Sequence, residues 1–452
     1  MTLNALGLNA PGSDLFVAKL DPSGTVLWAK NFGGLGAMVY ARGIVVDTSG
    51  NVYVGGYFGT ANMNTPALTL TYGATSDAFV IKLDALGNLA WAKNFGGASV
   101  TTQALGIALD GSGNVVLGGN FTGGNLTNSS LTKIGTKDGF LIKVSPSGTT
   151  LWAKNYGGSG ATIIGTAVAA DNEDNAYLVG ILDASLTTPS VTKIGSYDAF
   201  AIKVVSSTGA TAWAKNYGGS ALITRAFGVA VDASRNVYLT GEFGGHLTTP
   251  SITSTGTQDA FAFKLDSSGN TTWSKNFGGV GGTLWGDGIA VDASGNVYVG
   301  GTSNSSTSAF TRIGTGATTY DSFAYKLDAS GTTLWGRNFG GSGATFPDNP
   351  QNAYGGVSIG VDGSGNVVLG SNFSGASLTT PSVTRVGTRD GFVVKLLAAD
   401  GATSWNRSFN TQGPTAQVTV SSIVLDASNN AYIAGYLGWG WTAAATSTGA
   451  RA

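Results

Sequence analysis

Residues 77–97 read DAFVIKLDALGNLAWAKNFGG, and residues 104–121 continue as ALGIALDGSGNVVLGGNF. The two segments contain four short runs rich in β-branched and aromatic residues. Two tight turns, DALGN and DGSGN, and two looser connections separate the runs. Alternating or β-rich runs bounded by Gly and Asn predict β-strands joined by hairpins. This stretch therefore predicts one unit of four antiparallel strands.

The same unit recurs along the whole chain. The pattern D-x-F-x-x-K begins at Asp14, Asp77, Asp138, Asp198, Asp259, Asp321 and Asp390. Successive copies are separated by 63, 61, 60, 61, 62 and 69 residues, so one copy carries an insertion. A fixed period of this kind is the signature of a repeat architecture. We therefore expect residues 1–452 to form a single repeat domain.

The second tight turn of each copy has a specific backbone requirement. The residue before its shared Asn is Gly50, Gly113, Asp174, Arg235, Gly295, Gly365 or Asn429. Gly, Asn and Asp accept a left-handed backbone more readily than other residues. The turn is therefore predicted to be a hairpin corner with positive φ, with Arg235 slightly strained.

Four strands in each of seven copies make about 28 strands, too many for one stable open sheet. Radial repetition of four-stranded blades around a channel, a seven-bladed β-propeller, avoids this problem. A β-solenoid is the main alternative, but its repeats are normally shorter than about 30 residues. We predict the propeller.

Three segments of the repeat carry a resemblance to a known family. DAFVIKLD, GIAVDASGNVYVGG and the FGG that follows WAKN resemble the SBBP repeats of bacterial proteins named for their seven-bladed β-propeller. The resemblance extends over residues 13–439. It implies a propeller fold and an extracellular or cell-surface setting. It implies no shared catalytic residues.

The position of the chain ends within the repeat predicts how the ring closes. By analogy with other propellers, GIAVD is the innermost strand and LAWAKNF the outermost. The chain then begins with an outer pair, residues 14–32, and ends with an inner pair, residues 421–437. We expect these N-terminal outer strands and C-terminal inner strands to form one composite blade, which hides exposed sheet edges.

Composition excludes several classes of partner. With 24 basic and 25 acidic residues, the net charge of −1 offers no bulk field for nucleic acid or an anionic bilayer. No segment approaches the roughly 20 apolar residues of a membrane span. The start, MTLNALGLNAPGSDLF, has no basic segment before an apolar core, so no signal peptide is predicted. Met1 is either an engineered start or the start of a chain exported by another route.

The residues that recur in every copy are interpreted as scaffold. The repeat tryptophans are Trp28, Trp91, Trp152, Trp213, Trp273, Trp335 and Trp405. We expect them to pack between blades rather than to form a ligand platform. Recurring Asp and basic residues account for 14 of 25 acidic and 14 of 24 basic side chains, which predicts ion pairs and turn caps. The DxSGN turns lack the full calcium-loop spacing, so we expect no metal and no cofactor.

Signatures of catalysis are sparse. The one histidine, His246, is the only candidate for a Ser-His-Asp arrangement. Acidic residues outside the repeat frame are Glu173, Asp174, Asp183, Glu242, Asp287 and Asp348. Nothing in the sequence brings two of them together, although a glycosidase needs a carboxylate pair. We expect a non-enzyme.

Function is expected where the copies differ, on the longer loops at one end of the ring. The sixth copy inserts ATFPDNPQNAYGG, and the candidate binding residues are Tyr40, Trp285, Phe346, Asp348, Asn349, Asn352 and Tyr354. They suit a glycan or a protein ligand. We expect a non-catalytic extracellular adhesion module, monomeric or part of a larger assembly. The alternatives are a structural spacer and a glycan-active hydrolase, which would require a buried acidic pair at the central mouth.

Overall fold

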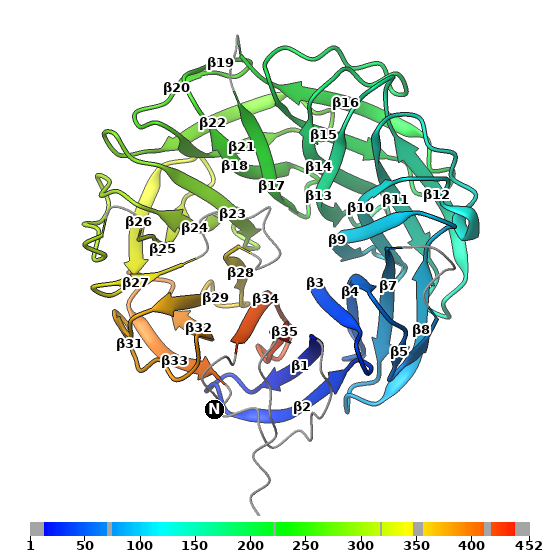
Figure 1. Cartoon of the computed structure of the whole chain (residues 1–452). Coiled ribbons are helices and arrows are strands. Elements are labelled where there is room, and N and C mark those ends of the chain that lie inside the picture. The colour runs from blue at the N-terminus through cyan, green and yellow to red at the C-terminus, as the bar shows by residue number, and fades with distance from the viewer. Residues whose placement is uncertain are drawn as a thin grey trace, which may run out of the picture.

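The computed structural model describes residues 13–69, 75–219, 223–316, 319–346, 356–410 and 417–438. The protein is all-β and β-propeller-like, with four-stranded antiparallel units arranged radially around a central opening (Figure 1). Among these residues, no helix is long and apolar enough to cross a membrane. The one helical segment described is a short 3-10 turn, η2 (Thr127–Ser129).

Each unit runs outward from the central opening in a fixed order. The innermost strands are β3 (Met38–Val46), β9 (Thr101–Leu109), β13 (Ile163–Ala170), β17 (Thr224–Val231), β23 (Leu284–Val291), β28 (Ser358–Val361) and β34 (Gln417–Leu425). The second strands are β4 (Val52–Gly59), β10 (Val115–Thr122), β14 (Ala176–Leu182), β18 (Val237–Phe243), β24 (Val297–Ser303), β29 (Val367–Gly375) and β35 (Ala431–Gly438). In every unit the innermost strand pairs antiparallel with the second strand.

The outer half of each unit follows the same order. The third strands are β7 (Ser76–Leu83), β11 (Lys137–Val144), β15 (Asp198–Val204), β21 (Asp259–Leu265), β25 (Asp321–Leu327), β32 (Arg389–Leu396) and β1 (Asp14–Leu20). The outermost strands are β8 (Leu89–Phe95), β12 (Thr150–Tyr156), β16 (Thr211–Tyr217), β22 (Thr271–Phe277), β26 (Thr333–Phe339), β33 (Thr403–Phe409) and β2 (Val26–Phe32).

Small elements occupy the loops between second and third strands. Three are short hairpins: β5 (Met63–Asn64) with β6 (Ala67–Leu68), β19 (His246–Thr248) with β20 (Ser251–Thr253), and β30 (Leu378–Thr379) with β31 (Ser382–Val383). A further strand, β27 (Ala344–Thr345), lies instead in the connection between β26 and β28, and it pairs with β29. Because all strands in a unit are antiparallel, the two tight turns lie at one end of the molecule and these longer loops at the other. We call them the tight-turn end and the long-loop end.

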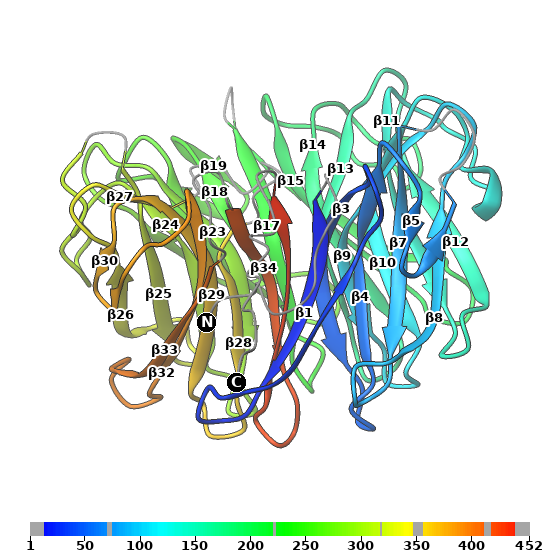
Figure 2. The same cartoon turned by 60° about the horizontal axis from the view of Figure 1, so that its bottom comes forward.

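The chain ends share one sheet. The third strand β1 pairs with the second strand β35 from Asp14↔Leu437 to Leu20↔Ala431, and β2 pairs with β1 on the other side. The strands from the two ends of the sequence lie side by side in both views (Figure 2). The order β34, β35, β1, β2 therefore repeats the order found within every other unit.

The hairpin corners have the backbone predicted from the sequence. The residue before the shared Asn has positive φ in every copy, including Asp174 (65°), Arg235 (67°) and Asn429 (64°). The hairpin Asp of each copy accepts a backbone N–H bond from the Asn four residues ahead. Six of the seven also accept one from the residue two ahead, as Asp47 does from Ser49 at 2.9 Å. These aspartates are turn caps.

The repeat tryptophans join neighbouring units, which confirms the packing interpretation. Each indole Nε1 donates to a backbone carbonyl in the outer turn of the next unit, over 2.8–3.3 Å. The acceptor turns also supply a glycine under the ring: Gly269 has φ +81°, and a Cβ there would lie 3.0 Å from Trp213. The Trp of the motif WAKN therefore takes part in the assembly of neighbouring units.

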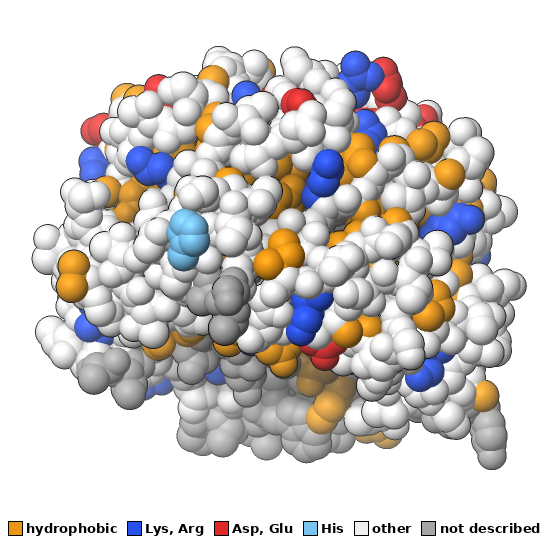
Figure 3. All heavy atoms as spheres, turned by 90° about the horizontal axis from the view of Figure 1, so that it is seen from above, with side chains coloured by type: hydrophobic (Ala, Val, Ile, Leu, Met, Phe, Trp, Pro, Cys, Tyr) orange, Lys and Arg blue, Asp and Glu red, His pale blue; other side chains and the backbone are white. Residues whose placement is uncertain are grey.

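The recurring charges are also structural. Third-strand lysines form ion pairs with hairpin aspartates: Lys143–Asp110 (2.6 Å), Lys395–Asp362 (2.9 Å), Lys203–Asp171 (3.6 Å) and Lys19–Asp426 (3.9 Å). The other aspartate set caps the long loops, as Asp138 does by accepting from the backbone of Ile134 and Gly135 at 2.8 Å. On the face of the molecule shown in Figure 3, charged side chains are scattered rather than gathered in one patch.

Candidate ligand-binding channel

A cavity of about 590 Å³ occupies the central opening, walled by the innermost strands. Recurring positions supply part of its lining. Four residues before the hairpin Asp, the lining residue is glycine, alanine or serine, and a β-branched residue follows it, as in Gly43–Ile44 and Gly288–Ile289. Its volume falls within the roughly 300–1,000 Å³ of small-molecule sites. The cavity is therefore large enough for a ligand group.

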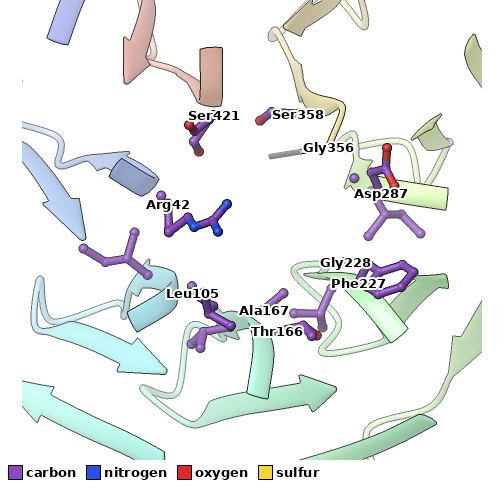
Figure 4. A pocket seen from close by; sticks show the side chains of 18 of the residues that line it. Arg42, Leu105, Thr166, Ala167, Phe227, Gly228, Asp287, Gly356, Ser358 and Ser421 are labelled. Carbon is purple, nitrogen blue, oxygen red and sulfur yellow. The ribbon is translucent and has the colours of Figure 1, made fainter. Parts of the chain in front are cut away.

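The residues that vary between copies enter this cavity through β-bulges. Innermost strands β3, β9, β13, β17, β23 and β34 each have a register shift against their second strand. The extra residue in each, which we call the bulge residue, is Arg42, Leu105, Thr166, Phe227, Asp287 or Ser421, five positions before the hairpin Asp. All of them line the cavity. A bulge redirects one side chain out of the normal alternation, so the least repetitive position of the strand faces the channel (Figure 4).

One side of the channel carries a cation among tyrosines. The Arg42 guanidinium lies 5.6 Å from the Tyr57 ring and donates to the Tyr57 hydroxyl at 3.4 Å. Tyr40 packs against Tyr57 and Tyr436, each with ring centroids 5.0 Å apart. In Figure 4 the Arg42 side chain extends into the opening. Lys137 adds a second basic residue to the lining.

The other side carries buried acids. Asp287 is 9% exposed and its Oδ2 accepts from the Val357 backbone N–H at 3.0 Å. Burial raises the pKa of Asp287 to about 8, the Val357 N–H opposes this rise, and the nearby Glu242 charge adds to it. Burial also raises the pKa of Glu242, and its ion pair with Arg225 at 3.0 Å counteracts that rise. The structure thus brings together Glu242 and Asp287, two acids that the sequence left apart.

Aromatic residues flank these acids. Phe227, the neighbouring bulge residue, is 8% exposed and lines the cavity. The Trp285 ring stacks on Tyr320 with centroids 5.0 Å apart, and its indole lowers the pKa of Glu242 through a hydrogen bond. The Arg225 guanidinium lies 5.3 Å from the Tyr197 ring. Aromatic rings therefore lie beside the two acids, and Phe227 brings one apolar ring face to the cavity itself.

The candidate residues chosen from the sequence fall in three places. Tyr40 and Trp285 lie on innermost strands β3 and β23, not in loops as we expected. Phe346 is 2% exposed and packs against Phe373 and Phe392, so the expectation that it binds ligand is corrected: its side chain belongs to the core. Asp348, Asn349, Asn352 and Tyr354 lie outside the described residues.

The remaining acids and the histidine are away from the channel. Glu173 forms an ion pair with Arg235, and Asp174 accepts from Ser112 in the neighbouring turn. Asp183 accepts from the Thr162 backbone. His246 lies exposed in the β19–β20 hairpin beside Thr253. Within the described ranges, no three His, Cys, Asp or Glu side chains gather as a metal site would require.

Sequence reasoning missed Arg42, Phe227 and Asp287 as lining residues. The signal was nonetheless present in the repeat. Five positions before the hairpin Asp, the copies hold a cation, an aliphatic residue, a hydroxyl, an aromatic and an acid, whereas the position two residues later is Ile or Val in every copy. Aligning the copies on that Asp separates scaffold positions from variable ones.

Comparison with known families agrees with this architecture. The sequence profile of the SBBP beta-propeller repeat matches residues 27–57 and 272–306. Two segments of this chain are therefore SBBP-type repeats. Each SBBP match contains an outermost-strand Trp, and the first extends through β3 and most of β4 to Tyr57. No curated protein sequence matches the chain.

Several solved structures are similar to this chain. Quinohemoprotein alcohol dehydrogenase from Comamonas testosteroni is 12% identical over 92% of this chain and 70% of that chain, with a TM-score of 0.40. An ulvan lyase of polysaccharide lyase family PL25 is 8% identical over 84% of this chain and 85% of the lyase chain, with a TM-score of 0.43. A fungal alcohol oxidase of the AA5 family is 9% identical over 89% of this chain and 74% of the oxidase chain, with a TM-score of 0.38. At these values no activity is transferred to this chain.

Proposed function

We propose that this chain is a seven-bladed β-propeller that acts as a non-catalytic binding module, with its ligand entering the channel from the long-loop end. The seven sequence copies and the pairing of β1 with β35 support the blade number and a ring closed by the chain ends. The contact of Trp405 with the Pro22 carbonyl at 2.9 Å repeats the junction found between other units. An extracellular setting rests on the SBBP repeats.

One observation carries the binding role: the residues that differ between copies converge on the channel. Scaffold residues such as Trp213 and Ile289 recur because every blade needs the same packing. Leu105, Phe227 and Asp287 occupy equivalent positions in different blades, so the fold does not dictate their type. A surface free of that constraint, on a rigid scaffold, is where binding residues are found. We expect a glycan or a protein loop as ligand.

The acidic pair near the channel makes a glycan-active enzyme the second candidate. Buried acids with raised pKa values are typical of catalytic sites. However, Glu242 is paired with Arg225 and does not line the cavity, so only Asp287 is placed to touch a ligand there. A glycosidase needs two carboxyl groups at the scissile bond. The geometry therefore favours binding without catalysis. New reducing ends released from bound glycans would support the enzyme instead.

The binding role is tested by filling the channel. Leu105→Phe and Ser421→Phe place at two bulges the residue type that Phe227 already has at a third, so we expect little change in melting temperature. Binding to hits from a glycan array should fall at least about tenfold, because the added rings occupy the cavity. Leu86→Phe, at a turn position that is 72% exposed, is the matched control.

Two outcomes would count against the proposal. Unchanged affinity of both channel variants would place the ligand elsewhere on the molecule. Absence of any ligand, together with concentration-dependent self-association in analytical ultracentrifugation, would favour the structural-spacer alternative.

A further inference from the structure

Asp287 lines the channel and has one carboxyl oxygen without a hydrogen-bond partner among the described residues. Its Oδ2 accepts from the Val357 N–H, but Oδ1 is buried and has no hydrogen-bond partner among the described residues. A buried polar atom without a partner costs about 1–3 kcal/mol. The carboxyl also lines the cavity, at the bulge of β23. A ligand group that reaches Oδ1 would complete its hydrogen bonding.

The surroundings keep this carboxyl protonated near neutral pH. Its pKa of about 8 arises mainly from burial. The charged groups next to it are Glu242 on β18 and, paired with Glu242, Arg225 on β17. Val357, which directly precedes β28, contacts Asp287 through its backbone N–H. A protonated carboxyl can donate one hydrogen bond and accept others, which suits hydroxyl groups.

The side of the channel opposite Asp287 carries a basic residue, Arg42. Arg42 and Asp287 lie on opposite sides of the opening in Figure 4. Arg42 extends into the cavity from β3, and its guanidinium matches a carboxylate or a sulfate in shape and charge. Phe227, next to Asp287 around the ring, adds an apolar face of the kind that packs against sugar rings.

We propose that the channel binds an anionic saccharide, with its acid group on Arg42 and a ring hydroxyl on the carboxyl of Asp287. This inference rests on the proposed binding function and specifies its ligand class. The two chemically different sides of the channel orient the ligand, because an acid group placed beside Asp287 would lose its ion pair with Arg42. Neutral saccharides lack the contact with Arg42 and bind less tightly.

The proposal carries a pH dependence with a defined sign. An anion in the channel disfavours the negative charge of ionised Asp287, so the ligand prefers the protonated form. Affinity should therefore be constant while the acid group of the ligand is ionised and Asp287 is protonated, and it should fall as the pH rises above about 8. Asp287→Asn removes the titrating group and should abolish this fall while leaving the acceptor for Val357 in place.

The test is a glycan array that holds uronate- and sulfate-bearing saccharides beside their methyl-esterified and desulfated counterparts, followed by calorimetric titration of the hits. Wild-type protein should prefer the acidic member of each pair. Arg42→Gln should weaken its binding about tenfold or more, since a hydrogen bond to a charged group is lost. Arg337→Gln, on the exposed face of β26, is the matched control and should bind as wild type. Melting curves confirm that each variant is folded.

The outcomes separate this inference from the proposed function. If neutral and acidic members bind equally and Arg42→Gln has no effect, the anionic saccharide is overturned and the binding function stands. If the fall in affinity above about pH 8 persists in Asp287→Asn, the role of Asp287 is overturned. If no saccharide binds wild-type protein, both this inference and the glycan-binding function fail.

Discussion

At the scale of single residues, the same position of the repeat serves packing in one blade and chemistry in another. Leu105 and Asp287 are equivalent bulge residues, yet one is an ordinary apolar side chain and the other a buried acid. The scaffold gains nothing from burying a carboxyl, because desolvation disfavours its charged form. Asp287 is therefore expected to lower stability and to be retained for binding.

This cost predicts a pH-dependent gain in stability for Asp287→Asn. In the folded protein the pKa of Asp287 is about 8, against an ordinary value of 3.8. Between these values the unfolded chain releases a proton that the folded protein keeps, so stability falls by up to about 1.4 kcal/mol per pH unit as the pH rises. The variant lacks this loss. Its melting temperature should match wild type near pH 4 and exceed it by pH 8.

Thermal melts across this pH range check the prediction. Asp400→Asn, on an exposed turn, is the control for loss of a carboxylate. An Asp287→Asn variant less stable than wild type at pH 8 would show that the ionised carboxylate is compensated in the folded state.

At the scale of elements, each unit is held by contacts between its strands and hairpin. In the second unit, Lys143 on β11 reaches Asp110 in the hairpin between β9 and β10, with both side chains at most 3% exposed. In the last unit, the equivalent pair Lys19–Asp426 is longer and 16% and 14% exposed. The same ion pair is therefore buried in one unit and partly hydrated in another.

This difference predicts unequal effects of one substitution. Lys143→Met leaves the buried Asp110 without its cation, which should lower the free energy of unfolding by about 3–5 kcal/mol. Lys19→Met removes a longer, partly hydrated pair and should cost about 1 kcal/mol or less. Urea unfolding of both variants measures the two values. Equal losses would mean that geometry and burial do not set the strength of this contact.

The elements also explain which features could be predicted from the sequence. The hairpin corner was predictable even at Arg235, because the φ requirement is local and steric. The bulges were not: an extra residue such as Thr166 becomes visible only when the strand is paired in register with β14. We expected Trp285 in a loop because the start of β23 shows no clear alternation of polar and apolar residues. Phe346 was chosen as a candidate because it lies in the insertion of the sixth copy. Its burial against Phe373 depends on tertiary packing, which the sequence does not show.

At the scale of the whole molecule, contacts between the two ends of the chain involve every layer of the sheet. The outer layer has the Trp405–Pro22 bond and a bond from Arg407 Nε to the Gly24 carbonyl at 2.8 Å. The middle layer has the β1–β35 ladder. At the channel, the Ile44 N–H donates to Ser422 Oγ at 3.2 Å. Residues near opposite ends of the sequence thus make the contacts that neighbouring repeats make elsewhere.

The same contacts predict that the ring depends on its last strands. Removing residues 421–452 deletes β35 and most of β34, and with them the buried side chains of Tyr432, Ile433, Tyr436 and Leu437. At about 1.5–3 kcal/mol for each large apolar side chain, and with the edge of β1 exposed, the loss is comparable to the roughly 5–15 kcal/mol that stabilises a typical domain. We expect a sharp drop in melting temperature and aggregation through the unpaired β1. Truncation at residue 438, which keeps β35, is the control. An unchanged melting curve after removal of 421–452 would show that the units are stable without joining the chain ends, since the other blades would then hold their fold as an open array.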